Sequence, residues 1–155
     1  MKRIVIRKGD VFCAEIENEY KCYFQYIERD RTQLGSNVIR VFKKHYPIVY
    51  EPIINEIIKD EVSFYAHTIL KFGVHDNVWH KVGTSKEVGD TRNVKFRMLG
   101  LGWYFWTINE SIQKVGVLNE TIRGYDFGWV FTYKEIIKKI KTGHYSDWLE
   151  FKERK

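Results

Sequence analysis

The sequence predicts an α+β fold in which about eight short strands form a curled, barrel-like antiparallel sheet, accompanied by two helices. Aromatic residues make up 16% of the 155 residues, and aromatic side chains are enriched in strands. Apolar and polar residues alternate over several short stretches, whereas helical periodicity is confined to two segments, at about 51–60 and 133–142. A parallel sheet is disfavoured, because strands and helices do not alternate regularly.

The N-terminal elements are predicted to form a β-hairpin. Lys8-Gly9-Asp10 signals a turn, and the alternating patterns of residues 11–17 and 20–28 are typical of strands. The polar residues Glu17-Asn18-Glu19 lie between them. We therefore expect the two strands to pair antiparallel.

The middle of the chain contains one helix pattern and several short strand patterns. In the helix predicted at 51–60, four isoleucines fall at positions i, i+1, i+4 and i+5, with Pro52 near the first turn. Residues 83–93 are polar and are predicted to form a loop. Further strands are predicted at 37–43, 62–72, 78–82, 94–99, 103–108, 114–118 and 128–131.

The C-terminal helix has clear signals at both ends. Thr132 and Glu135 have the spacing of a capping box, in which each side chain satisfies a backbone N–H of the first turn. Lysines follow in the last turn, where the helix dipole favours cations, and Gly143 is placed to end the helix. These signals predict a helix over about 133–142.

A single domain spanning residues 1–155 is expected, because a chain of this length buries roughly 70% of its unfolded surface around one core. The formal net charge is +6. Residues 1–8 carry four basic residues and no acidic one, residues 134–155 carry seven basic and four acidic, and residues 9–133 carry fifteen basic and sixteen acidic. The surplus therefore lies at the two ends, which does not support a basic stripe across the body.

The N-terminus carries no pattern of a secretory signal. Its short apolar run, Ile4-Val5-Ile6, is interrupted at once by Arg7 and Lys8. No stretch approaches the roughly 20 apolar residues of a membrane span. We expect a cytoplasmic protein that does not act on a membrane.

The hairpin contains both cysteines of the chain, Cys13 and Cys22. A two-residue loop at 17–18 or 18–19 would place them on the same face, since strand side chains alternate with period two. Zinc requires four ligands, and no Cys-x-x-Cys or paired-histidine spacing supplies the others. We expect two buried thiols that behave as small apolar side chains, with redox chemistry as the alternative.

The sequence shows no recognisable catalytic or cofactor motif. His75, Asp76 and His80 form its densest group of possible metal ligands, but a spacing of five suits neither one helix face nor one strand face. His67 alternates within an apolar strand and is expected to be half-buried. Nucleophile elbows and phosphate-binding loops are absent from the sequence. The expectation is a protein without catalysis, metal or cofactor.

Aromatic side chains are the remaining candidates for a functional surface. Alternation in Trp103-Tyr104-Phe105-Trp106 gives both strand faces aromatic residues, and the second face requires a cover. Burial under the C-terminal segment, which contains Trp148, would supply one. Base stacking is another possibility, although such modules add a basic groove. A protein interface is the third, and Trp79, Tyr104 and Trp106 are the candidate partner-binding residues.

Two short motifs carry a resemblance to a known family. Gly9-Asp10-Val11-Phe12 and Trp79-His80-Lys81-Val82-Gly83, with the hairpin, the third strand and the isoleucine-rich helix between them, resemble the immunity protein 26 family of bacterial polymorphic toxin systems. The resemblance covers about residues 8–99. Lys21 and Cys22 depart from the glycine-rich turn expected there, and residues 100–155 show no resemblance to the family.

The resemblance implies an α+β fold and the neutralisation of a cognate toxin by direct binding, without catalysis. The alternative is a nucleic-acid-binding β-barrel module that uses the basic termini and exposed aromatic residues. Salt distinguishes the two, because phosphate contacts release counterions and lose affinity steeply as salt rises. The sequence does not indicate an oligomeric state.

Overall fold

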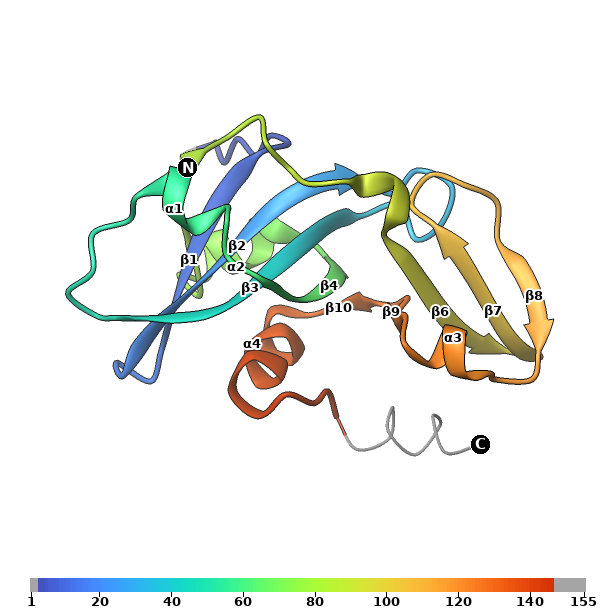
Figure 1. Cartoon of the computed structure of the whole chain (residues 1–155). Helices are drawn as coiled ribbons and strands as arrows, with labels where there is room; N and C mark the ends of the chain where they lie inside the picture. The colour runs from blue at the N-terminus through green and yellow to red at the C-terminus, as the bar shows by residue number, and fades with distance from the viewer. Residues whose placement is uncertain (1–2, 147–155) are drawn as a thin grey trace.

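The computed structural model describes residues 3–146 and contains two sheets and four short α-helices (Figure 1). The predicted α+β class is confirmed. The strands form two curled, open sheets instead of one sheet that approaches a barrel. None of the helices within residues 3–146 combines the length and the apolar character needed to cross a membrane.

The larger sheet has six strands in the order β10-β4-β3-β2-β1-β5. Its members are β1 (Asp10–Ile16), β2 (Tyr20–Arg29), β3 (Asn37–Pro47), β4 (Val62–Thr68), β5 (His80–Thr84) and β10 (Val130–Phe131). Every neighbouring pair is antiparallel except β10 and β4, which run parallel.

The smaller sheet has four strands in the order β8-β7-β6-β9. They are β6 (Lys95–Gly100), β7 (Gly102–Thr107), β8 (Gln113–Gly116) and β9 (Asp126–Phe127). β9 joins β6 in parallel, and the other pairs are antiparallel. The chain passes from β5 of the larger sheet to β6 through residues 85–94 and returns from β9 to β10 through residues 128–129, so two connections link the sheets.

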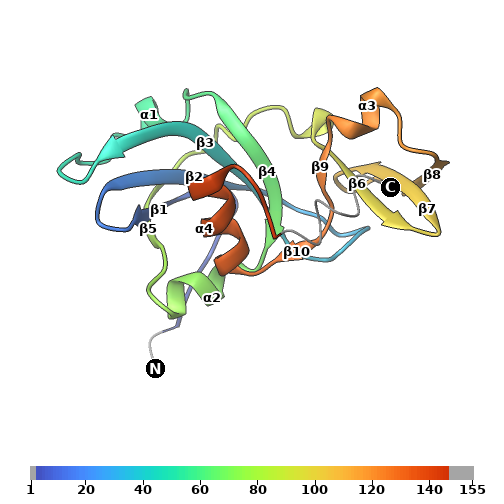
Figure 2. The ribbon, with the colours of Figure 1, turned by 90° about the horizontal axis from the view of Figure 1, so that it is seen from below.

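The helices cover both faces of the larger sheet. α2 (Leu70–His75) and α4 (Tyr133–Thr142) lie on one face of it (Figure 2). There they enclose an apolar core that contains Trp79. α1 (Ile54–Ile57) covers the other face with Ile57, in a second cluster with Val11. α3 (Glu120–Arg123) precedes β9 beside the smaller sheet.

The predicted hairpin is confirmed as β1 and β2, but the prediction that Cys13 and Cys22 share a face is wrong. The turn has three residues, because Ile16 pairs directly with Tyr20. Cys13 then lies opposite Tyr23 and packs in the cluster on the face covered by α1. Cys22 packs in the core on the opposite face, which α2 and α4 cover. One additional loop residue shifts the register by one and moves a side chain to the other face.

The apolar run predicted as one strand over 62–72 changes structure at its end. β4 stops at Thr68, and α2 begins at Leu70, whose N–H donates to the side-chain oxygen of Asn37. Gly73 allows the helix to lie on the indole of Trp79, since a Cβ there would come within 2.0 Å of the ring. This tertiary contact favours a helix over a longer strand.

Other boundaries also differ from the predictions. The helix predicted at 51–60 is helical only over Ile54–Ile57, and the loop predicted at 83–93 includes a short 3₁₀ helix, Thr91–Asn93. The strand predicted at 128–131 forms only over Val130–Phe131, as β10, and β9 (Asp126–Phe127) in the other sheet was not predicted. α3, which was not predicted, begins at the cap Asn119, whose side chain accepts from the N–H of Ile122.

The C-terminal helix lies at 133–142 as predicted. Thr132 Oγ1 accepts from the N–H of Glu135, and Gly143 ends the helix with φ = 81°. Only half of the predicted capping box forms, because the Glu135 carboxylate instead accepts from the N–H and hydroxyl of Ser146. Trp148 lies outside the described residues.

Candidate partner-binding groove

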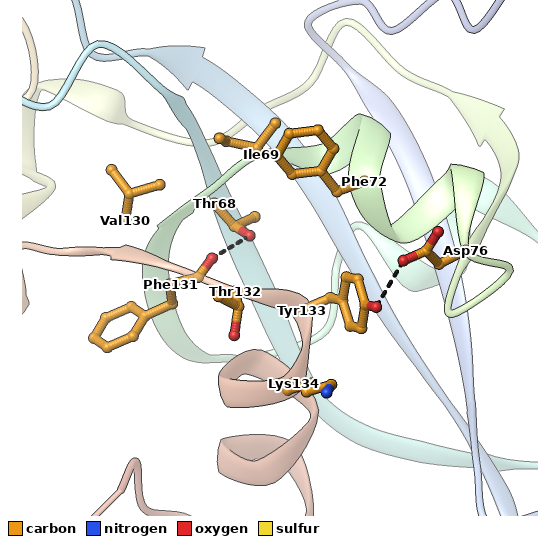
Figure 3. A pocket seen from close by; sticks show the side chains of 9 residues that line it. All are labelled: Thr68, Ile69, Phe72, Asp76, Val130, Phe131, Thr132, Tyr133 and Lys134. Atoms are coloured by element: carbon orange, nitrogen blue, oxygen red, sulfur yellow. Dashed lines mark hydrogen bonds between the residues drawn. The ribbon is translucent and has the colours of Figure 1, made fainter.

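A pocket of about 420 Å³ lies where the end of β4, α2, β10 and the start of α4 meet (Figure 3). β10 pairs in parallel with the end of β4, and Thr68 Oγ1 donates to the carbonyl oxygen of Phe131 at 2.7 Å. The chain then turns at Thr132 into α4. The lining residues are Thr68, Ile69, Phe72, Asp76, Val130, Phe131, Thr132, Tyr133 and Lys134.

A second hollow of about 470 Å³ adjoins this pocket. Both are lined by Ile69, Phe72 and Val130, which therefore form a ridge between them. We call the two hollows and this ridge the groove. Phe72 is 52% exposed and Ile69 is 37% exposed. A folded protein rarely leaves neighbouring large apolar side chains open to water unless something covers them.

A hydrogen-bonded pair closes one end of the groove. The hydroxyl of Tyr133 donates to Asp76 Oδ2 at 2.7 Å (Figure 3), and His75 Nδ1 lies 2.8 Å from Asp76 Oδ1. The pKa of Asp76 lies below its ordinary value because Tyr133 and His75 hydrogen-bond the carboxylate. The pair joins α2 to α4 and holds the two walls of the groove together.

Cations surround the groove. Lys134 lines the pocket, while Arg29 and Lys71 line the adjoining hollow. All three side chains are exposed. Asp76 is the carboxylate in the combined lining, and both of its oxygens already have partners. The groove is therefore apolar at its centre and positive at its margin.

The three residues predicted to bind a partner lie in different environments. Trp79 is 1% exposed and Trp106 is 0% exposed, so both are core residues in this conformation. Trp79 donates its Nε1–H to the carbonyl oxygen of Leu70 and packs edge-on against Tyr133, which places it beneath the groove. Tyr104 is half-buried in β7, outside the groove lining.

Sequence reasoning missed the residues of the ridge. Phe72 fell at the end of a predicted strand, and Val130 fell inside another. No local pattern indicates that residues about 63 positions apart meet, as Thr68 and Phe131 do. The sequence does contain one relevant signal: Gly73 and Gly128 are each flanked by large apolar or aromatic residues. In the structure both glycines pack closely on a tryptophan, since a Cβ at either position would lie 2.0 Å from a tryptophan ring.

The densest group of possible metal ligands in the sequence, around His75, does not converge. His75 pairs with the neighbouring Asp76 at the end of α2, whereas His80 is exposed on β5. Within residues 3–146 no group of three or more histidine, cysteine or acidic side chains is arranged to hold a metal ion.

A buried carboxylate–imidazole pair lies away from the groove. Asp30 and His67 are 0% exposed, and neither lines the groove. His67 is therefore fully buried, where half-burial was predicted. An acid–base pair that acts on a substrate must reach it, so the burial of these two side chains indicates a structural role.

The fold and the groove define a small α+β protein with an apolar, cation-lined recess. The family model Immunity protein 26 matches residues 7–105, well over half of the chain, and the chain belongs to this family. The predicted resemblance is thereby confirmed. No curated protein and no solved structure matches the chain.

The motifs behind the resemblance maintain the fold. Gly9 has φ = 99°, and a Cβ there would lie 2.3 Å from the carbonyl oxygen of Ser85. Asp10, 1% exposed, accepts from the N–H of Arg7 and pairs with Lys81 at 3.1 Å. These contacts fasten β1 to β5 and the segment after it, and they do not involve the groove.

The matched region ends within β7 and supplies only one wall of the groove. Ile69, Phe72 and Asp76 belong to it, whereas β10 and the start of α4 follow it. The second wall is therefore built by the part of the chain that the family model does not describe.

Proposed function

We propose that this immunity-family protein protects its cell by binding a cognate toxin domain directly, without chemistry on the toxin, and that the toxin docks on the groove. An immunity family implies a toxin partner in general terms. The observation that carries the specific proposal is Phe72, an aromatic side chain 52% exposed on the ridge between two hollows. Interfaces concentrate their binding energy on such aromatic anchors.

Three further features support binding over catalysis. The buried Asp30–His67 pair does not line the groove, and both carboxylate oxygens of Asp76 are already hydrogen-bonded, one to Tyr133 and one to His75. The groove lining includes no cysteine and no serine beside a histidine base.

An inhibitor that binds a toxin acting inside the cell has to be present there, so we place the protein in the cytoplasm.

Tyr104 is proposed as a secondary contact. It is the half-buried member of the three aromatic residues predicted for this role, and Lys114 Nζ lies 6.0 Å from its ring centroid. A partner that also covered the smaller sheet would contact it.

The test is co-expression of the chain with the toxic domain encoded by its gene neighbour, scored as survival, together with the affinity of the purified pair. Phe72→Ala is expected to weaken the complex by about 2 kcal/mol or more, roughly 30-fold. Val49→Ala is the matched control, since Val49 is an exposed apolar side chain (88%) outside the groove lining. It should leave affinity within about twofold.

Failure of the wild-type chain to protect would overturn the proposal. If that failure came with tight binding to RNA or DNA that weakened steeply with salt, the nucleic-acid function would replace it. Equal effects of Phe72→Ala and Val49→Ala would keep the immunity function but exclude the groove as its site.

A further inference from the structure

We infer that the groove takes an acidic segment of the partner protein that carries a bulky apolar side chain. The inference rests on the proposed function in one respect, namely that the partner is a protein. Its chemistry follows from the lining of the groove itself.

The apolar anchor is indicated by the ridge and its hollows. The two hollows have volumes of about 420 and 470 Å³, and both volumes fall within the range of pockets that bury a ligand group. Ile69, Phe72 and Val130 present apolar surface to both hollows. A large apolar side chain placed against this ridge would cover the exposed area of Phe72 and release its water.

The negative charge of the partner is indicated by the margin of the groove. No described carboxylate forms an ion pair with Arg29, Lys71 or Lys134. Asp76 reduces the local charge but cannot neutralise three cations. The N-terminus of α4 opens at the same place, although Glu135 in its first turn offsets part of the helix dipole.

The charge is a local property of this surface. Residues 9–133, which contain most of the fold, carry fifteen basic and sixteen acidic residues. The N-terminal and C-terminal parts of the chain contribute the surplus, and Lys134 belongs to the latter. Acidic residues on either side of the partner's anchor would lie near Lys71 and Lys134, and complementary charge improves both specificity and association rate.

A second copy of this chain is a poorer occupant. Two copies would each bring a formal charge of +6, and docking the cation-lined groove on another basic chain adds repulsion. An acidic partner reverses the sign of this term.

The experiment titrates the ¹⁵N-labelled full chain with three synthetic peptides of about twelve residues. Each has one central tryptophan flanked by glutamate, by glutamine or by lysine. At low salt the glutamate peptide is expected to shift the amide signals of Phe72 and Lys134 and to bind at least about fivefold more tightly than the glutamine peptide. The lysine peptide should not bind.

Two charge-reversal variants control the result. Lys71→Glu with Lys134→Glu should remove the preference for the glutamate peptide. Lys59→Glu with Lys86→Glu makes the same change in charge at exposed lysines outside the groove lining and should retain the preference. Thermal unfolding of both variants checks that each is folded.

The outcomes separate this inference from the proposed function. Equal binding of the three peptides, no binding of any, or a preference that survives Lys71→Glu with Lys134→Glu would overturn the inference. A dimer of the free chain that Phe72→Ala dissociates would assign the groove to a second copy. If the peptide preference holds but the chain gives no protection, the proposed function is wrong and the groove chemistry stands.

Discussion

His67 Nε2 lies 2.8 Å from Asp30 Oδ2, and the same oxygen accepts the indole N–H of Trp106 at 2.7 Å. All three side chains are 0% exposed. His67 belongs to β4 of the larger sheet, and Trp106 to β7 of the smaller one. Asp30 follows β2 and joins the two sheets through one carboxylate.

The first prediction concerns the strength of this junction. Asp30→Asn removes the charge while keeping the shape, so the bonds from His67 and Trp106 weaken. Hydrogen bonds to a charged group contribute about 1.5–3 kcal/mol, and we expect the free energy of unfolding in urea to fall by about 2–3 kcal/mol.

Glu51→Gln is the control for Asp30→Asn, because Glu51 is an exposed acidic residue in the loop before α1. It should change the free energy of unfolding by no more than about 0.5 kcal/mol. If the two variants were equally stable, the carboxylate would contribute nothing to the junction.

The second prediction concerns acid stability. Burial raises the pKa of Asp30, but hydrogen bonds from His67, Trp106 and the N–H of Asn109 outweigh it and hold this pKa below the ordinary value of 3.8. Between the two values the unfolded chain binds more protons than the folded one. The contribution of Asp30 to stability is therefore complete above pH 3.8 and is lost as pH falls through the folded pKa.

The indole N–H signal of Trp106 should report this titration directly, since it donates to the carboxylate. Its chemical shift, followed from about pH 6 to 2, should have its midpoint below the ordinary pKa of Asp30. The free energy of unfolding should decline over the same range. A midpoint above 3.8 would show that burial outweighs the hydrogen bonds.

The third prediction concerns the glycine of the N-terminal motif. Gly9 and Gly116 both have positive φ, 99° and 85°. A Cβ at Gly9 would lie 2.3 Å from the carbonyl oxygen of Ser85, whereas nothing lies within 4 Å of one at Gly116. Gly116→Ala should cost only the backbone strain, about 1–2 kcal/mol, and Gly9→Ala should cost clearly more.

Urea unfolding of both variants checks this prediction. Because backbone strain is similar in the two, the difference between them isolates the close approach to Ser85. Equal losses of stability would mean that strain alone explains the glycine of the motif.

The parts of the fold that the sequence predicted are those with local signals. Thr132 and Gly143 mark the ends of α4, and alternation around a polar turn marks β1 and β2. The faces of Cys13 and Cys22 could not be predicted, since they depend on whether the turn has two residues or three.

The groove could not be predicted for a different reason. It exists because β10 pairs with β4 across a large separation in sequence, and because α2 rests on Trp79 through Gly73. Trp79 was predicted to be an interface residue only because it is a large aromatic side chain, and such a side chain suits a core position equally well. Phe72, the exposed aromatic residue nearby, had no sequence signal of its own.

The fourth prediction concerns the thiols. Burial raises the pKa of Cys13, and it raises the pKa of Cys22 to about 12. Only the thiolate reacts readily, so neither cysteine should be alkylated in the native protein at pH 8. Mass spectrometry after iodoacetamide treatment should find both modified in urea. Rapid native modification would contradict the burial of the two side chains.

The last prediction separates the core role of Trp79 from contact with a partner. The Trp79 indole packs edge-on against the ring of Phe24, with centroids 5.0 Å apart, and lies beneath Tyr133. Truncating this buried indole would leave a cavity in the core. Trp79→Ala should lower the free energy of unfolding by about 3–5 kcal/mol. Trp79→Phe retains most of the packing but loses the hydrogen bond to the carbonyl oxygen of Leu70, and it should cost less.

Binding to the toxin domain should be measured for both Trp79 variants at a temperature where each is folded. Trp79→Phe is expected to bind within about threefold of wild type, because the side chain lies beneath the groove and does not reach its surface. Phe72→Ala, at an exposed position, should show the opposite pattern, with near-normal stability and weak binding. If Trp79→Phe were fully stable but failed to bind, Trp79 would have to become exposed in the complex, and its assignment to the core of the bound state would be wrong.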